Sequence, residues 1–241
     1  MLTLMKYNQY TTLLAAAMLG FAVQAHGATV SFFTIADTYL RQSTPTTTGQ
    51  SDTDNEVIVG SISGSPGVRG LIRFDLSALS ALGTIQINSV SLIGTNRSVT
   101  NGAGTVGNIS VFDYGFEFVE NTATWNNPDG AGGDTTAGGT LSSTLVATVN
   151  HSSSAGAVAN FSSESAFTTV VSSALSGDNT VNLLLKRTTE TSSNNYARFA
   201  SREHSDNNPF ELAIDYTVVP EPSAALFGGF ALLALVLRRR R

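Results

Sequence analysis

The acidic run Ser51–Glu56, "SDTDNE", is the densest group of metal-binding residue types in the sequence. Carboxylate and amide oxygens are the hard ligands that Ca²⁺ prefers in proteins. Val57 follows where an EF-hand loop would continue with polar ligands and glycine, so the EF-hand pattern is absent. We therefore weigh a structural Ca²⁺ site against a solvated acidic turn. The candidate ligands are Asp52, Asp54, Asn55 and Glu56, together with Asp37 further upstream.

Arg73 is a second candidate, because it lies in an apolar run that predicts a strand. Side chains alternate along a strand, so Arg73 and Asp75 share one face while Ile72 and Phe74 share the other. A guanidinium group suits the recognition of hydroxyl and carboxylate groups. A structural ion pair is the alternative for this arginine. The carboxylates that we consider as its partners are Asp75, Glu203 and Asp215.

Trp125 is the only tryptophan in the sequence. A flat aromatic face that stacks on a sugar ring is the usual means of carbohydrate recognition. The stretch from Glu120 to Trp125 also predicts a turn that leads into a strand, and tryptophan is highly buried on average. Trp125 is therefore either a ligand platform or a core residue. The competing aromatic side chains are Tyr39, Tyr114 and Tyr196.

Catalytic patterns find little support. Two histidines, His151 and His204, lie outside the predicted signal peptide, and neither occurs in a metal-ligand spacing such as His-Glu-x-x-His. No nucleophile elbow or phosphate loop is present in the sequence. The absence of cysteine excludes thiol catalysis and zinc–thiolate sites. Carboxylate pairs that hydrolyse glycosides are always available in an acidic chain. We expect a non-enzyme; the alternatives are a polysaccharide lyase or glycoside hydrolase and a purely structural matrix protein.

Many short strands must position these residues. They are rich in β-branched and aromatic residues and are separated by Gly, Asn, Asp and Ser turns, which favours an all-β fold. We predict a single antiparallel β-sandwich, jelly-roll-like, with at most one short helix at 166–175. A phase slip is expected near Asn88, and the low-complexity segment 127–140 is expected to be a mobile loop. The predicted strands are 30–34, 36–40, 57–59, 71–74, 85–93, 109–112, 145–149, 158–161, 181–185, 196–200 and 212–216.

The N-terminal residues 1–28 predict a secretory signal peptide. Lys6 precedes the apolar stretch 13–23, and small residues follow it, so that cleavage after Ala25 or Ala28 fits. An uncleaved anchor is the alternative. We expect the folded domain to span 29–217 and a separate segment to span 218–241.

The C-terminal segment contains an uncharged apolar run of 14 residues, Ala224 to Leu237. As a helix it would rise about 21 Å, which is short for a hydrocarbon core about 30 Å thick. The segment resembles the PEP-CTERM sorting signal of Gram-negative exopolysaccharide producers, and a plain membrane anchor is the alternative. The resemblance implies recognition and cleavage by an exosortase while the segment transiently occupies the inner membrane. It rests on Pro220, Glu221 and Pro222 and on the terminal Arg238, Arg239, Arg240 and Arg241.

The charge between the two predicted signals is strongly acidic. Residues 29–219 contain eight basic and seventeen acidic residues, a formal net charge of −9. Nucleic-acid binding needs a basic surface, so we expect no nucleic-acid partner. Such a domain attracts divalent cations more readily than anions.

Four stretches together resemble the DNRLRE-type domain, a β-sandwich family grouped with carbohydrate-binding modules. They are residues 36–60, 68–79, 110–127 and 198–216, and Ser201-Arg202-Glu203 is among the most telling motifs. The resemblance implies a sandwich fold and glycan binding. We therefore expect an exported module at the cell surface or in the extracellular matrix, with extracellular polysaccharide as its partner. The candidate ligand-binding residues are Trp125, Arg73 and Arg202.

Overall fold

The computed structural model describes residues 27–49, 56–62, 64–97, 105–141, 144–163, 165–191, 194–204 and 209–219. Residues Ala28–Leu82 and Ile87–Tyr216 belong to one compact unit, which contains every candidate ligand-binding and metal-binding residue. The sorting motif falls outside the described residues, and so does the predicted signal peptide apart from its last two residues. Among the described helices, none is both long and apolar enough to cross a membrane.

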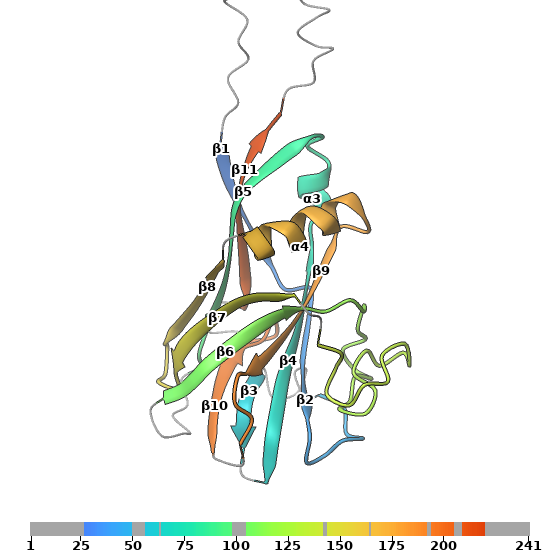
Figure 1. The fold of residues 1–241 in the computed structure, drawn as a ribbon, viewed down its shortest axis with the longest axis vertical. Coiled ribbons are helices and arrows are strands. Elements are labelled where there is room, and N and C mark those ends of the chain that lie inside the picture. The colour runs from blue at the N-terminus through green and yellow to red at the C-terminus, as the bar shows by residue number, and fades with distance from the viewer. Residues whose placement is uncertain are drawn as a thin grey trace, which may run out of the picture. The chain divides into compact units, whose positions relative to one another are not determined.

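The described strands are arranged in two sheets and every strand pair whose register is known is antiparallel, which confirms the all-β prediction (Figure 1). The first sheet has the order β1 (Gly27–Phe33), β11 (Glu211–Val218), β5 (Ile85–Thr95) and β8 (Val158–Ser163). The second has the order β10 (Asn195–Ala200), β3 (Glu56–Ile62), β4 (Ser65–Asp75), β9 (Thr180–Arg187), β6 (Thr105–Asp113) and β7 (Leu145–Ser152), and β2 (Ala36–Arg41) pairs with β4.

The predicted strands all correspond to observed ones, including the irregular β5. Its residues 90, 92 and 94 are buried, whereas the neighbouring 88 and 89 are both exposed. Two successive exposed residues shift the alternation by one position, as the phase slip near Asn88 predicted. The shift lets the second half of β5 contribute to the core.

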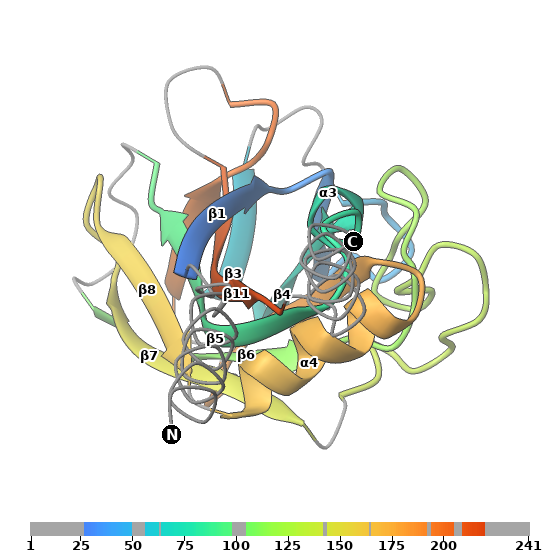
Figure 2. The same cartoon turned by 90° about the horizontal axis from the view of Figure 1, so that it is seen from above.

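The predicted helix is observed as α4 (Ser165–Ser176), which connects β8 of the first sheet to β9 of the second. Phe167, Val170 and Val171 are buried, at the spacing of one helical face. Figure 2 shows α4 beside α3 (Ser77–Ser80), a single turn after β4 that the sequence did not predict. The short α3 has no hydrophobic periodicity of its own that could indicate it.

The inner face of the second sheet forms the main core with the first sheet. Ile72 of β4 and its cross-strand partner Leu183 of β9 are fully buried. Leu92 of β5 and its partner Phe161 of β8 are fully buried in the first sheet. Each such side chain contributes about 1.5–3 kcal/mol relative to exposure.

The outer face of the second sheet is also covered, by the long connection 114–141 between β6 and β7. Leu71 is adjacent in sequence to Ile72, and its partner Leu184 is adjacent to Leu183. Because side chains alternate along a strand, both leucines point to the outer face. Both are fully buried. The strand β9 is therefore apolar on both faces, as its run of three leucines indicates. The side chains that pack with them are Ala36, Leu40, Tyr114, Phe118, Ala123 and Trp125.

Two aspartates organise the low-complexity part of this connection. Asp129 accepts hydrogen bonds from the backbone N–H groups of residues 131, 132 and 133. Asp134 accepts from the backbone of Thr140 at 2.7 Å and from the Tyr114 hydroxyl at 2.8 Å. Burial opposes the ionisation of both carboxyls, yet these hydrogen bonds hold the pKa of each below its usual value. The contacts argue against the mobile loop that its composition predicts.

Candidate functional site

Three carboxylates from distant parts of the chain meet beside the start of β2. Asp37 is the second residue of β2, Glu120 lies in the 114–141 connection, and Glu203 lies in the turn after β10. One oxygen atom from each lies within 4.8 Å of the others. We call these three residues the carboxylate cluster. It is a group of hard oxygen atoms of the kind that binds divalent cations.

Strand pairing directs Asp37 into the protein. It is the cross-strand partner of Ile72, so both side chains point to the inner face of the sheet. Asp37 is 0% exposed. Its Oδ2 accepts hydrogen bonds from the Thr34 hydroxyl at 3.0 Å and from the Arg202 backbone N–H at 2.8 Å. Its Oδ1 has no hydrogen-bond partner among the described residues.

Arg202 links the other two carboxylates. Its Nη2 lies 2.9 Å from Glu120 Oε2, and its Nε forms an ion pair with Glu203 Oε1. The Glu120 Oε1 atom accepts from the backbone N–H of Asp37 at 3.4 Å. The Arg202 side chain is 42% exposed, so it lies at the surface above the buried Asp37 carboxyl.

The electrostatics of the cluster follow from its burial and its charges. The pKa of Asp37 is raised to about 7, mostly by burial and in part by the nearby charges of Glu203 and Glu120. The hydrogen bonds from Arg202 and Thr34 oppose this rise. Burial opposes the charge on Arg202, but the carboxylates of Glu120 and Glu203 more than compensate, so its pKa is raised.

Arg73 lies on the opposite face of the sheet from Asp37 and pairs with a residue that we did not predict. It is the cross-strand partner of Ala36, which precedes Asp37. Its guanidinium forms an ion pair with Glu117, lies 3.3 Å from the Phe118 carbonyl and sits over the Phe118 ring at 5.6 Å. This pairing contradicts the three predicted partners.

Two of those three predicted partners have other roles. Asp75 accepts from the backbone N–H of Ser77, at the start of α3, at 2.8 Å. Asp215 accepts from the Asn88 amide at 3.2 Å. Asp75 and Asp215 thus bind groups of neighbouring elements. Arg73 instead pairs with Glu117, which belongs to the 114–141 connection.

Trp125 lies away from this cluster and is only 7% exposed. The Arg69 guanidinium sits over its ring at 5.0 Å. A methyl group added to Gly67 or to Gly138 would lie 2.6 or 2.7 Å from atoms of the Trp125 ring. The backbone of two separate segments therefore packs directly against the ring. The ring is therefore enclosed, which favours the core interpretation over the ligand platform.

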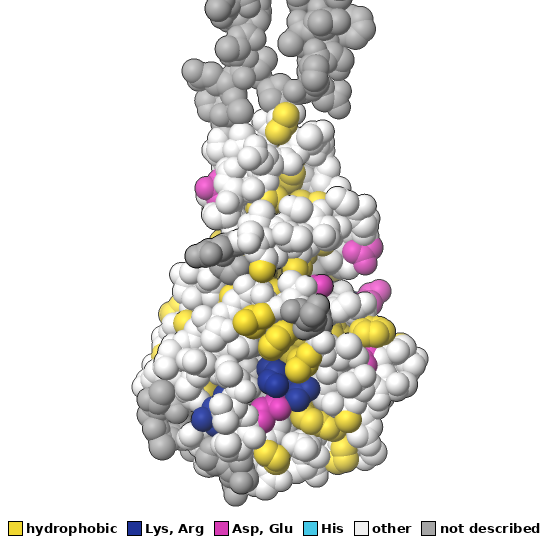
Figure 3. Space-filling view, viewed as in Figure 1, with side chains coloured by type: hydrophobic (Ala, Val, Ile, Leu, Met, Phe, Trp, Pro, Cys, Tyr) yellow, Lys and Arg dark blue, Asp and Glu magenta, His cyan; other side chains and the backbone are white. Residues whose placement is uncertain are grey.

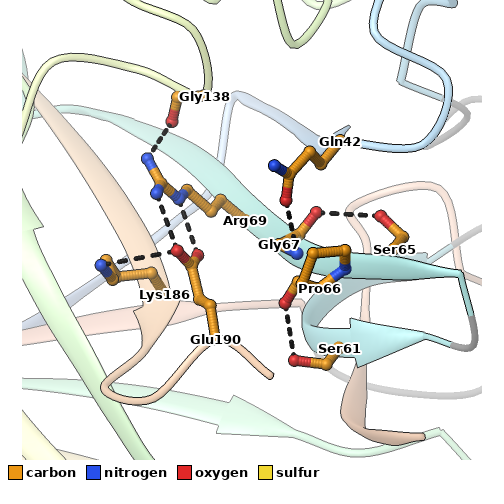
Figure 4. A network of polar contacts seen from close by, with 9 residues as sticks. All are labelled: Gln42, Ser61, Ser65, Pro66, Gly67, Arg69, Gly138, Lys186 and Glu190. Atoms are coloured by element: carbon orange, nitrogen blue, oxygen red, sulfur yellow. Dashed lines mark hydrogen bonds and ion pairs between the residues drawn. The ribbon is translucent and has the colours of Figure 1, made fainter. Parts of the chain in front are cut away.

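Arg69 is the centre of the polar network shown in Figure 4. Its Nε and Nη2 donate to the two carboxylate oxygens of Glu190, both at 2.8 Å, and its Nη1 donates to the Gly138 carbonyl at 2.8 Å. Lys186 lies 3.7 Å from the same Glu190. Bidentate geometry of this kind is the strong form of an ion pair. It holds the 114–141 connection against β4 and β9.

Figure 3 shows that the charged side chains on the face drawn are of both signs and border hydrophobic ones. They do not gather into a broad basic patch on that face.

Glu56, a predicted Ca²⁺ ligand, is instead paired with two arginines. Its Oε2 lies 3.1 Å from Arg97 and 3.4 Å from Arg198, and the residue is buried. Two guanidinium groups already satisfy this carboxylate, which contradicts its predicted place in a metal site. The other predicted ligands of the same run, Asp52, Asp54 and Asn55, lie outside the described residues.

Sequence reasoning identified Asp37, Arg73 and Arg202 as candidate site residues but did not identify the side chains that they contact. The structure brings Asp37 and Arg202 together with Glu120, whereas Arg73 lies on the opposite face of the sheet and pairs with Glu117. No local signal points to this grouping, because Asp37 contacts residues 83 and 165 positions away along the chain.

The fold and the site define a β-sandwich module with a polar, partly exposed cluster at its surface. The model of carbohydrate-binding module family 96 matches residues 28–216, and the chain therefore belongs to this family. The match covers the compact unit that carries the carboxylate cluster. No curated protein matches the chain.

Proposed function

We propose that this protein is an exported, non-catalytic module that binds an extracellular polysaccharide. The observation that carries the proposal is the family match over residues 28–216. It agrees with the resemblance seen in the sequence, which covers the same part of the chain. Carbohydrate-binding modules of this kind are generally not catalytic.

The surface around Arg202 is the part of the structure best suited to polar recognition of a sugar. Arg202 is exposed, with a side-chain exposure of 42%, and so is Glu117, at 71%, in the same connection as Glu120. A guanidinium group offers several donors to hydroxyl or carboxylate groups, and Glu117 offers acceptors. Because Trp125 is enclosed, we expect binding through hydrogen bonds rather than through stacking on that ring.

Burial argues against a hydrolase at the carboxylate cluster. A glycosidase needs two carboxyl groups that reach the scissile bond from both sides. Asp37 is fully buried and accepts a hydrogen bond from the backbone N–H of Arg202, so its carboxyl is not exposed to a substrate in this structure. We therefore assign the cluster no catalytic step.

Export and sorting complete the proposal. The N-terminal segment would direct secretion, and the motif Pro220-Glu221-Pro222 with its arginine tail would be recognised by an exosortase in the inner membrane. After processing, the domain would reside at the cell surface or in the extracellular matrix. Replacing Pro220, Glu221 and Pro222 with alanine in an exosortase-containing strain should block the change in protein size and location. Unchanged processing would contradict the sorting signal.

The binding proposal is tested with full-length protein, purified in mild detergent, and the producer's own exopolysaccharide. We expect saturable binding by calorimetry, weakened at least about tenfold by Arg202→Ala, as for loss of a charged hydrogen bond. Arg187→Ala is the matched control, since it removes an arginine of β9 outside the cluster. Absence of binding would favour a purely structural matrix protein, and shortening of the polysaccharide would favour an enzyme.

A further inference from the structure

We infer that the carboxylate cluster is a Ca²⁺ site, in which Asp37, Glu120 and Glu203 each supply an oxygen ligand. The inference goes beyond polysaccharide binding and does not depend on it. It rests on the spacing of the three oxygens, on two buried oxygens that have no partner, and on the local excess of negative charge.

The spacing of the oxygens suits calcium. Calcium–oxygen distances are about 2.3–2.6 Å, so ligands on opposite sides of the ion are about 5 Å apart. The three oxygens of the cluster lie within 4.8 Å of one another, which fits inside that span. Mg²⁺ is usually held by one or two carboxylates and keeps several waters, so a group of three carboxylates favours Ca²⁺.

Two buried oxygens of the cluster lack a hydrogen-bond partner. Asp37 is 0% exposed, yet its Oδ1 accepts no hydrogen bond from any described residue. Glu203 Oε2 is buried in the same way. A buried carboxylate oxygen without a donor is costly, and buried charges are normally paired or coordinate a metal. A cation shared by the two oxygens would satisfy both.

The charge balance leaves room for a cation beside Arg202. Three carboxylates and one guanidinium carry a formal charge of −2 when all are ionised. Arg202 occupies Oε2 of Glu120 and Oε1 of Glu203, and only its backbone N–H contacts Asp37. The guanidinium therefore does not use the two unpartnered oxygens. A divalent ion would neutralise the remaining charge.

The test is equilibrium dialysis of radioactive calcium against the full-length protein at calcium concentrations up to about 10 mM, which covers the range of weak extracellular sites. We compare the wild type with Asp37→Asn and with Glu203→Gln, each of which removes a charge and almost no volume. Glu117→Gln is the matched control, because it removes the same charge from a neighbouring exposed carboxylate outside the cluster.

We expect Asp37→Asn and Glu203→Gln each to lose one equivalent of bound Ca²⁺ that the wild type and Glu117→Gln retain. The Ca²⁺-induced rise in the melting temperature should be lost in the same two variants, and Mg²⁺ should produce a smaller rise in the wild type. Circular dichroism in EDTA checks that each variant is folded. If Asp37→Asn does not fold, the number of Ca²⁺ equivalents bound by Glu203→Gln tests the inference alone.

The inference is overturned if the variants of the cluster bind as many equivalents as Glu117→Gln, or if Mg²⁺ stabilises the wild type as strongly as Ca²⁺. A variant in which both Asp52 and Asp54 are replaced should keep the equivalent of bound Ca²⁺ that we assign to the cluster. Loss of that equivalent in this variant would show that the ion binds at the acidic run instead. Because no polysaccharide is present, failure here is distinct from failure of the proposed binding function.

Discussion

Acid should destabilise this protein through one buried imidazole, that of His151 on β7. His151 is 3% exposed and stacks on Phe199 with the ring centroids 5.2 Å apart. Its Nε2 lies 3.1 Å from Asn96 Oδ1. The Asn96 amide nitrogen already donates to two backbone carbonyls, of Ser152 and Ser154, so Oδ1 accepts and the neutral imidazole carries its proton on Nε2.

Burial lowers the pKa of His151 from 6.5 to about 4. The unfolded chain therefore takes up a proton near pH 6.5, whereas the folded protein does so only near pH 4. The stabilising contribution is complete above pH 6.5 and is lost as the pH falls. These two pKa values correspond to a loss of about 2 kcal/mol between pH 7.5 and pH 5, and about 3 kcal/mol by pH 4.

The assay is urea unfolding of the wild type and of His151→Gln at several pH values between 5 and 7.5. Asp37, whose pKa is raised to about 7, acts in the opposite direction: its contribution is present at low pH and lost as the pH rises. That effect is common to both proteins, so only their difference reports on His151. The wild type should lose about 2 kcal/mol relative to the variant on going from pH 7.5 to pH 5. A difference that stays constant over this range would refute the reasoning.

Three further predictions concern packing and the 114–141 connection, each measured by urea unfolding. Gly94→Ala should cost about 1–3 kcal/mol, because the added methyl would lie 2.4 Å from a Phe210 ring carbon, while Gly115→Ala, with open space around it, should change stability by less than about 0.5 kcal/mol. Trp125→Ala should cost about 3–5 kcal/mol; a change below about 1 kcal/mol would mean that the ring is not part of the core. Asp134→Asn should cost about 1–3 kcal/mol and should speed proteolysis within 127–140, and an unchanged cleavage rate would show that this carboxylate does not hold the segment.

The strands and the main helix were predictable because their signals are local. Alternating side chains in β5 and the apolar spacing 167, 170 and 171 in α4 reflect which residues face the core within one element. A single turn such as α3 is too short to produce a periodic pattern. The order of the strands in the sheets has no local signal, so it was beyond the same reasoning.

Residue type alone limited what could be said about the candidate site. The sequence indicated that Asp37 is a potential ligand and that Arg73 needs a carboxylate, and the structure pairs Arg73 with Glu117. The partners were wrong or missing because Glu117 and Glu120 belong to a long connection with no regular structure. Glu56 was predicted as a metal ligand from its residue type alone. In the structure, two arginines from other parts of the chain pair with it.

The sequence by itself determined a strongly acidic, cysteine-free, all-β domain between two predicted signals, because composition and side-chain alternation are properties of the chain. Only the tertiary structure decided which polar groups meet. It enclosed Trp125 under Arg69 and brought Asp37, Glu120 and Glu203 within 4.8 Å of one another. The physical reason is that these contacts join residues far apart in the sequence, and their proximity depends on how two sheets and a long connection pack together.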